Sequence, residues 1–154
     1  MIYISLLVQH HGGPTADVLL GKNENGIWEF PNGHVMTGET EEEACERIAW
    51  EVLGIKVNVI KRALIGAKYP SNGVTEHILQ RNITHNNRPK DVWHCYYEVY
   101  NKWQNEPVSD KYTEFKWVHP SELGKEEFEG DDKNFMAKYD PYVNPKFIPD
   151  VRML

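Results

Sequence analysis

Charged side chains suited to chemistry are concentrated between residues 33 and 55, in the stretch GHVMTGETEEEACERIAWEVLGI. Glu43, Arg47 and Glu51 follow one another at intervals of four residues, which places them on one side of a helix. Carboxylates offer the oxygen ligands that hard divalent cations require. The same spacing is typical of a surface salt-bridge ladder that needs no catalysis. The spacing alone leaves both interpretations open.

The element that must position these side chains is a loop followed by a helix. Glutamates at 41–43 lie where the helix dipole favours anions, and Gly54 is a typical residue for closing a helix. With Thr40 or Thr37 as the N-terminal cap, we predict a helix from about Glu41 to Leu53. In projection the polar half holds Glu43, Glu46, Arg47 and Glu51, and the apolar half holds Ala44, Cys45, Ile48, Ala49, Val52 and Leu53.

Several of these residues stand at fixed offsets from Gly33. They are Glu39, Arg47, Glu51, Gly54 and Ile55. The offsets resemble the Nudix signature, which is G, five residues, E, seven residues, then R-E-U-x-E-E-x-G-U with U a bulky aliphatic residue. The flanking pieces ADVLLGK, IWEFPNGHV and EFKWVHPSEL also resemble family strands, and GHV and WE most resemble the MutT-like branch that hydrolyses nucleoside triphosphates. The resemblance extends over about residues 2–123.

The resemblance implies an α+β protein with the Nudix fold, in which a mixed β-sheet is sandwiched between helices. It further implies a hydrolase of a nucleoside diphosphate-linked substrate, above all a nucleoside triphosphate, with Mg²⁺ or Mn²⁺ as cofactor. By this resemblance Glu51 is a metal ligand, and a main-chain carbonyl from Asn32 reaches the metal. Arg47 and Glu39 brace the loop and helix, so that these two and Glu51 are the catalytic candidates. His34 could face the phosphates, or could be a structural or solvated histidine.

Two of the three metal-binding glutamates on the family's helix are missing. Ile48 and Val52 stand in their places and offer no oxygen ligand. Glu46 and Asp110 are candidate substitute ligands, the latter because several Nudix enzymes add a carboxylate from the loop before the last strand. We therefore expect a Nudix hydrolase with impaired metal binding and activity. The alternative is a Nudix-fold module that has lost catalysis and binds a nucleotide or a protein.

Aromatic and basic side chains outside the signature are candidates for substrate binding. Trp28, Trp93 and Tyr97 could stack on a nucleobase, or could be core aromatics. Arg81 and the basic residues of the loop 86–91 could offset substrate phosphates, or could form a solvated hairpin tip. Alternation along the chain does not decide between these roles.

The remaining sequence predicts one domain over residues 1–154, in which 124–154 form a C-terminal helix and an extended tail. The formal net charge of −6 argues against a nucleic-acid polymer as partner. Cys45 and Cys95 lack metal or disulfide spacing and are expected to be buried thiols. The apolar run IYISLLV is too short for a signal peptide core with a cleavage site, which predicts a cytoplasmic protein without membrane contact. The apolar tail is expected to pack on the domain or on a second subunit of a homodimer.

Hydrophobic patterning and turn residues predict the other elements. Strands are expected at residues 2–9, 17–21, 56–67, 76–85, 92–103 and 114–119, a turn at 31–33, and a helix capped by Asp131 or Asp132 that continues to about Tyr139.

Overall fold

The computed structural model describes residues 2–10, 16–64 and 93–137. The strand predicted at 76–85, and with it Arg81 and the loop 86–91, lies outside the described residues, as does the tail from residue 138. Within the described ranges, none of the helices is long and apolar enough to span a bilayer.

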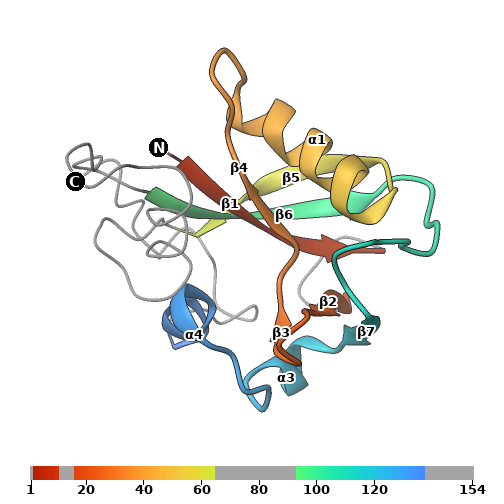
Figure 1. Ribbon diagram of the computed structural model, residues 1–154, viewed down its shortest axis with the longest axis vertical. Coiled ribbons are helices and arrows are strands. Elements are labelled where there is room, and N and C mark those ends of the chain that lie inside the picture. Colours follow the sequence, from red (N-terminus) through yellow and green to blue (C-terminus); the bar gives the residue numbers. More distant parts are fainter. Residues whose placement is uncertain (1, 11–15, 65–92, 138–154) are drawn as a thin grey trace.

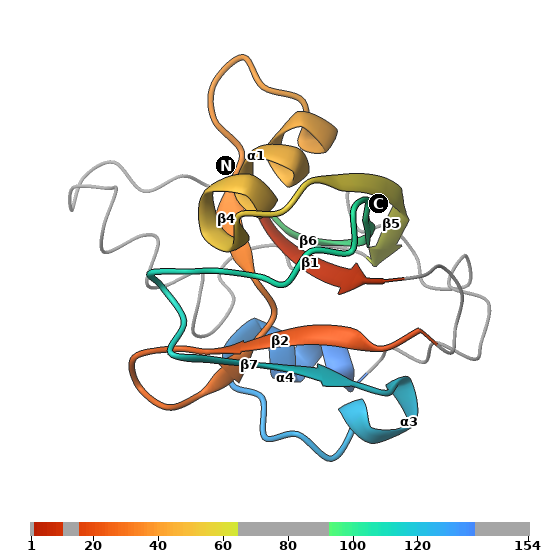
Figure 2. The same ribbon diagram turned by 90° about the vertical axis from the view of Figure 1, so that its right-hand side faces the viewer.

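The described residues form a mixed sheet of seven strands. The strands are β1 (Ile2–Gln9), β2 (Val18–Lys22), β3 (Trp28–Glu29), β4 (Asn32–His34), β5 (Val57–Leu64), β6 (Trp93–Asn101) and β7 (Glu114–Val118). β1 lies at the centre because it pairs in parallel with β6 and antiparallel with β2 and β4. β1 and β2 are in register at one pair of residues, Gln9 and Val18. Beyond this pair, β2 and β7 diverge from β1, β5 and β6 (Figure 2).

Helices lie on both faces of this sheet. α1 (Glu41–Leu53) covers one face, and α4 (Gly130–Met136) lies on the other, with the short helix α3 (Pro120–Leu123) beside it (Figure 1). The predicted α+β architecture, a mixed sheet sandwiched between helices, is confirmed. The order of the strands in the main path is β3-β2-β1-β6-β5.

The bounds of α1 follow from its two caps, as the sequence predicts. The Thr40 side chain accepts a hydrogen bond from the Glu43 amide at 3.1 Å, and the Glu43 carboxylate accepts one from the Thr40 amide. At the other end Gly54 has a φ of 65°, and its amide donates to the carbonyls of Ala49 and Trp50. Thr40, and not Thr37, is therefore the N-cap.

Two apolar clusters fill the faces of the sheet. The cluster under α1 includes Ile4, Leu6, Val8, Leu19, Ala44, Cys45, Ile48, Ala49, Leu53, Cys95, Tyr97, Val99 and Tyr112. The cluster on the opposite side includes Leu7, Val18, Leu20, Phe30, Tyr96, Leu123, Phe128 and Phe135. Cys45 and Cys95 are buried thiols that form no disulfide, which confirms the prediction for both. β1 supplies side chains to both clusters, as its nearly continuous apolar run indicates.

Two local predictions are wrong. The turn expected at 31–33 is interrupted by β4, because Asn32 and Gly33 pair with Ser5 and Ile4 of β1 in a register that the local sequence does not encode. α4 begins after Glu129 and ends at Met136, and no side chain caps its start. Asp131 and Asp132 face the sheet, where their carboxylates bind side chains of β6, and so they are not available as caps.

Candidate functional site

Arg47 holds the loop before α1 against the helix. Its Nε lies 2.7 Å from Glu39 Oε2, and its Nη2 donates to Glu39 Oε1 at 3.1 Å and to the main-chain oxygen of His34 at 2.6 Å. Nη1 donates to Glu51 Oε2 at 3.1 Å. The bond from Arg47 lowers the pKa of the Glu39 carboxyl, and Glu39 raises the pKa of the guanidinium. A two-pronged guanidinium contact of this kind fixes loop geometry more tightly than a lysine contact does.

Ile48 packs under the loop at Gly33. Its side chain is 1 % exposed, and a Cβ atom at Gly33 would lie 2.8 Å from Ile48 Cγ1. A glycine at position 33 is therefore required for the close approach of β4 and α1. Val52 is partly buried against the same apolar cluster. The prediction that both residues belong to the core side of the helix is confirmed.

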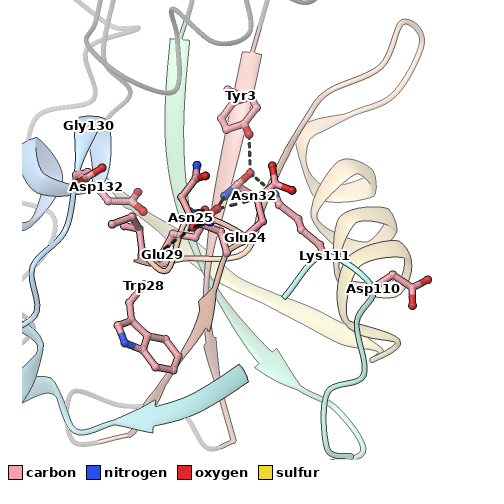
Figure 3. A pocket seen from close by; sticks show the side chains of 13 residues that line it. Tyr3, Glu24, Asn25, Trp28, Glu29, Asn32, Asp110, Lys111, Gly130 and Asp132 are labelled. Carbon is pink, nitrogen blue, oxygen red and sulfur yellow. Dashed lines mark hydrogen bonds and ion pairs between the residues drawn. The ribbon is translucent and has the colours of Figure 1, made fainter. Parts of the chain in front are cut away.

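The residues near α1 do not fit a metal cluster built on this helix. Among the described residues, no group of three or more His, Cys, Asp or Glu side chains could hold a metal ion. The Glu51 carboxylate is bound to Arg47, and Glu46 is exposed. The Asp110 carboxylate points away from the other side chains drawn in Figure 3. Hard cations need several oxygen ligands that converge, and these carboxylates do not converge.

Asn32 is a buried polar residue at the centre of a hydrogen-bond network. Its Oδ1 accepts from Tyr3 Oη at 2.5 Å and from Lys111 Nζ at 2.9 Å. Its Nδ2 donates to the main-chain oxygen of Phe30 at 2.8 Å and to the Glu29 carboxylate. The side chain thus joins β1, β3 and the loop 102–113 just ahead of Gly33.

A pocket of about 600 Å³ opens beside this network (Figure 3). It is lined by the start of β1, the turn between β2 and β3, the loop before β7 and the start of α4. The lining includes five acidic residues and a single described basic residue, Lys111. The acidic residues are Glu24, Glu29, Asp110, Glu129 and Asp132, and the carboxylate of Asp110 points away from the others. Such a lining suits ligand groups that donate hydrogen bonds, for example amino, imino and hydroxyl groups.

Asp132 brings a buried carboxylate to this pocket. Its Oδ1 accepts from Tyr96 Oη at 2.7 Å, and its Oδ2 accepts from the Phe30 amide at 3.3 Å. Burial raises the pKa of Asp132 from 3.8 to about 6, although the hydrogen bond from Tyr96 and the nearby His94 act in the opposite direction. The neighbouring residue Asp131 forms a hydrogen bond between its Oδ2 and His94 Nδ1, which lie 2.9 Å apart.

The aromatic candidates have different positions. Trp28 lines the pocket, and Lys116 Nζ lies 4.3 Å from the centre of its ring. Tyr97 belongs to the core under α1, where its hydroxyl donates to Glu41 Oε1 at 2.5 Å. Trp93 is the first residue of β6, and its side chain lies outside the described part of the structure. The structure therefore brings Trp28, Asn32 and Asp110 to the pocket, whereas His34, Glu39, Arg47 and Glu51 meet on the adjacent loop and helix.

Sequence reasoning missed several residues of this site. Tyr3 lies in an apolar strand and Lys111 in a polar loop, so neither has a local signal of its role. The sequence indicated Asp132 only as a possible N-terminal cap of the last helix, and not as a residue of the site. Glu29 is part of the WE piece that resembles the family, and this resemblance was the one feature of the sequence that could have indicated its role in the site.

Comparison with known proteins supplies a family. The model of the NUDIX domain matches residues 5–139. A curated relative, the low-salt glycan biosynthesis protein Agl8 of Haloferax volcanii, is 38% identical over 66 residues. That match spans 40% of this chain and 40% of the relative.

Solved structures share the fold over most of the chain. The MutT protein of Methanosarcina mazei Go1 has a TM-score of 0.65 at 18% identity, with 91% of this chain and 92% of that chain covered. The dihydroneopterin triphosphate pyrophosphohydrolase of E. coli has a TM-score of 0.63 at 12% identity, with 92% and 96% covered. At these identities the likeness concerns the fold.

Proposed function

This chain belongs to the NUDIX domain family, and we propose that it hydrolyses the diphosphate linkage of a nucleotide, with a nucleoside triphosphate as the preferred substrate. The family's fold is that of hydrolases of nucleoside diphosphate-linked compounds. In such a reaction water attacks a phosphorus atom, and positive groups stabilise the charge that develops on the phosphoryl oxygens.

The observation that carries the proposal is the position of the pocket beside the signature loop. Asn32 both lines the pocket and directly precedes Gly33, the first residue of the signature. The loop that follows is held on α1 by Arg47 through Glu39 and the His34 carbonyl. A nucleotide whose base or sugar enters the pocket would thus have its phosphates near the loop. Glu51, Arg47 and Glu39 remain the proposed functional residues of the loop and helix.

The proposed substrate class agrees with the names of similar structures. One of them is named a MutT protein and another a triphosphate pyrophosphohydrolase. The name of the Haloferax volcanii relative refers to glycan biosynthesis. Nucleotides that carry a sugar therefore belong in the substrate panel beside the nucleoside triphosphates.

Metal dependence is the part of the proposal that the helix supports least. Nudix hydrolases in general use divalent metals, and Glu51 is the one helix carboxylate left at a signature position. We propose weak binding of Mg²⁺ or Mn²⁺ in which Glu51 takes part, with Glu46 and Asp110 as candidate additional ligands and the Asn32 main chain as a further oxygen donor.

The test is calorimetric titration with Mg²⁺ and Mn²⁺, alone and with nucleoside triphosphates and nucleotide sugars, followed by chromatography of the products. We expect turnover that Glu51→Gln lowers by at least about tenfold, because the variant loses the charged oxygen ligand proposed for the divalent ion. Glu42→Gln is the matched control, because it removes an exposed carboxylate from the same helix to which the proposal gives no role. Equal activity of Glu51→Gln and the wild type contradicts the role of Glu51.

A second function is favoured by the burial of Ile48 against Gly33, where the family carries a metal-binding glutamate. In this alternative the protein binds a nucleotide without hydrolysing it. Nucleotide binding with neither metal affinity nor turnover would support it. Turnover that requires a divalent metal would exclude it.

A further inference from the structure

We infer that Lys111 binds the diphosphate of the substrate and orients it toward the signature loop. This inference rests on the proposed function, because it names the group that would hold the phosphates of the same nucleotide. Lys111 lies in the loop between β6 and β7, outside the signature and 79 residues along the chain from Asn32.

The charge around the pocket limits where a diphosphate can lie. Besides Asp110, whose carboxylate points away from the other side chains, four acidic residues line the pocket: Glu24, Glu29, Glu129 and Asp132. A diphosphate placed among them would meet repulsion between like charges, which is costly where water is partly excluded. Lys111 is the single basic residue among the described side chains of the lining. The donor-bearing ring of a nucleotide fits the acidic part, and the diphosphate fits beside Lys111.

Other basic side chains nearby are held by carboxylates. Arg47 is bound to Glu39 and Glu51. Lys22 and Lys116, which both lie over the Trp28 ring, are in ion pairs with Glu114 and Glu126 at 3.1 and 2.7 Å. Lys111 Nζ donates to the neutral amide oxygen of Asn32 at 2.9 Å and forms a longer ion pair with Glu29 Oε2 at 3.9 Å. It can exchange an amide oxygen for a phosphate oxygen, which is a stronger, charge-assisted acceptor.

The loop that carries Lys111 is anchored at several points. The Val108 amide donates to the Leu53 carbonyl at the end of α1, and the Thr113 amide donates to the Lys22 carbonyl of β2. Between these anchors Tyr112 packs its ring on Gly21 and donates its hydroxyl to Glu29 at 3.1 Å. The main chain of Lys111 is thereby placed, whereas its side chain is 42% exposed. Figure 3 shows this side chain reaching toward Asn32.

Because α1 lacks two of the family's metal-binding carboxylates, positive charge for the phosphates must come from another part of the site. Ile48 and Val52 remove two of the carboxylates through which a Nudix helix would hold metal charge near the phosphates. A diphosphate still needs compensating positive charge wherever it is bound away from bulk water. Lys111 supplies one such charge directly, without a metal ligand on the helix.

The experiment compares the wild type with Lys111→Gln, Lys111→Arg and, as matched control, Lys102→Gln, which removes an exposed lysine that does not line the pocket. Calorimetry measures the affinity for ADP, GDP and CDP, and for the corresponding nucleosides. We expect Lys111→Gln to weaken diphosphate binding by about tenfold and to leave nucleoside binding unchanged. Lys111→Arg keeps the charge and should stay within about threefold of the wild type. Higher salt should weaken diphosphate binding more in the wild type than in Lys111→Gln.

The outcomes separate this inference from the proposed function. Diphosphate binding that is equal in the wild type and Lys111→Gln overturns the role of Lys111 and leaves the hydrolase proposal standing. An equal loss of diphosphate and nucleoside affinity also overturns it, because that result indicates a structural role. If the wild type binds none of the diphosphates, triphosphates or nucleotide sugars, the proposed function fails, and this inference fails with it.

Discussion

Replacement of Ile48 by glutamate tests the packing of α1 directly. The side chain is 1 % exposed and lies against Gly33, so the new carboxylate would enter the apolar cluster under the helix. Loss of the buried aliphatic group costs about 2 kcal/mol. An unpaired carboxylate in the same place adds a penalty that brings the total to about 4 kcal/mol. Val52→Glu should cost about 1 kcal/mol, because Val52 is only partly buried.

The assay is equilibrium unfolding in urea, followed by tryptophan fluorescence, for the wild type, both single variants and the double variant. Ile48→Val is the control and should lose about 1 kcal/mol, as expected for one deleted methyl group. The double variant restores two family carboxylates, so we expect it to gain Mg²⁺ affinity and any diphosphatase activity. Mg²⁺ at about ten times its dissociation constant would return about 1.4 kcal/mol of stability.

Two results would refute this reasoning. If Ile48→Glu unfolds at the same urea concentration as the wild type without metal, the helix face is not packed as described. If the double variant gains neither metal affinity nor activity, the metal site is lost for reasons beyond positions 48 and 52.

Three further predictions concern the loop, the pocket and its titratable group. Arg47→Lys cannot keep the two-pronged contact with Glu39, and it should cost about 1 kcal/mol of unfolding free energy, since the ion pair is partly exposed. Gly21→Ala would place a Cβ atom 2.5 Å from Tyr112 Cγ. The clash should cost about 2 kcal/mol and, by moving the anchored loop, also weaken diphosphate binding. Asp132 has a folded-state pKa raised from 3.8 to about 6, so the stability it contributes is full below about pH 4 and is lost as pH rises through about 6. The stability difference between the wild type and Asp132→Asn should therefore fall by up to about 3 kcal/mol between these pH values.

Each of these has a contrary outcome. Thermal and urea unfolding of Arg47→Lys that match the wild type would show that the contact with Glu39 adds nothing to stability. A Gly21→Ala variant with wild-type stability would mean that Tyr112 moves without cost. If the unfolding free energies of the wild type and Asp132→Asn change by the same amount across the pH range, Asp132 does not titrate as its burial requires.

The sequence by itself determined α1 and its surroundings. A threonine cap at Thr40 or Thr37, the glutamates at 41–43 and Gly54 predicted the bounds of the helix, because capping depends on residues within one turn of one another. The structure then selected Thr40. The apolar half of the helix followed from the same periodicity. The contact of Arg47 with Glu39 could be predicted, because the signature places Glu39 in the loop directly before the helix that carries Arg47.

Only the tertiary structure decided the pocket and its charges. Lys111 meets Asn32 across 79 residues, and Asp132 meets Phe30 across 102, so no local pattern relates them. β4 exists because β1 offers it an antiparallel edge, and Asp132 faces Tyr96 because α4 packs on the sheet. The physical reason is range: caps and helix faces are set by neighbours along the chain, whereas strand pairing and buried polar contacts depend on how distant segments are brought together.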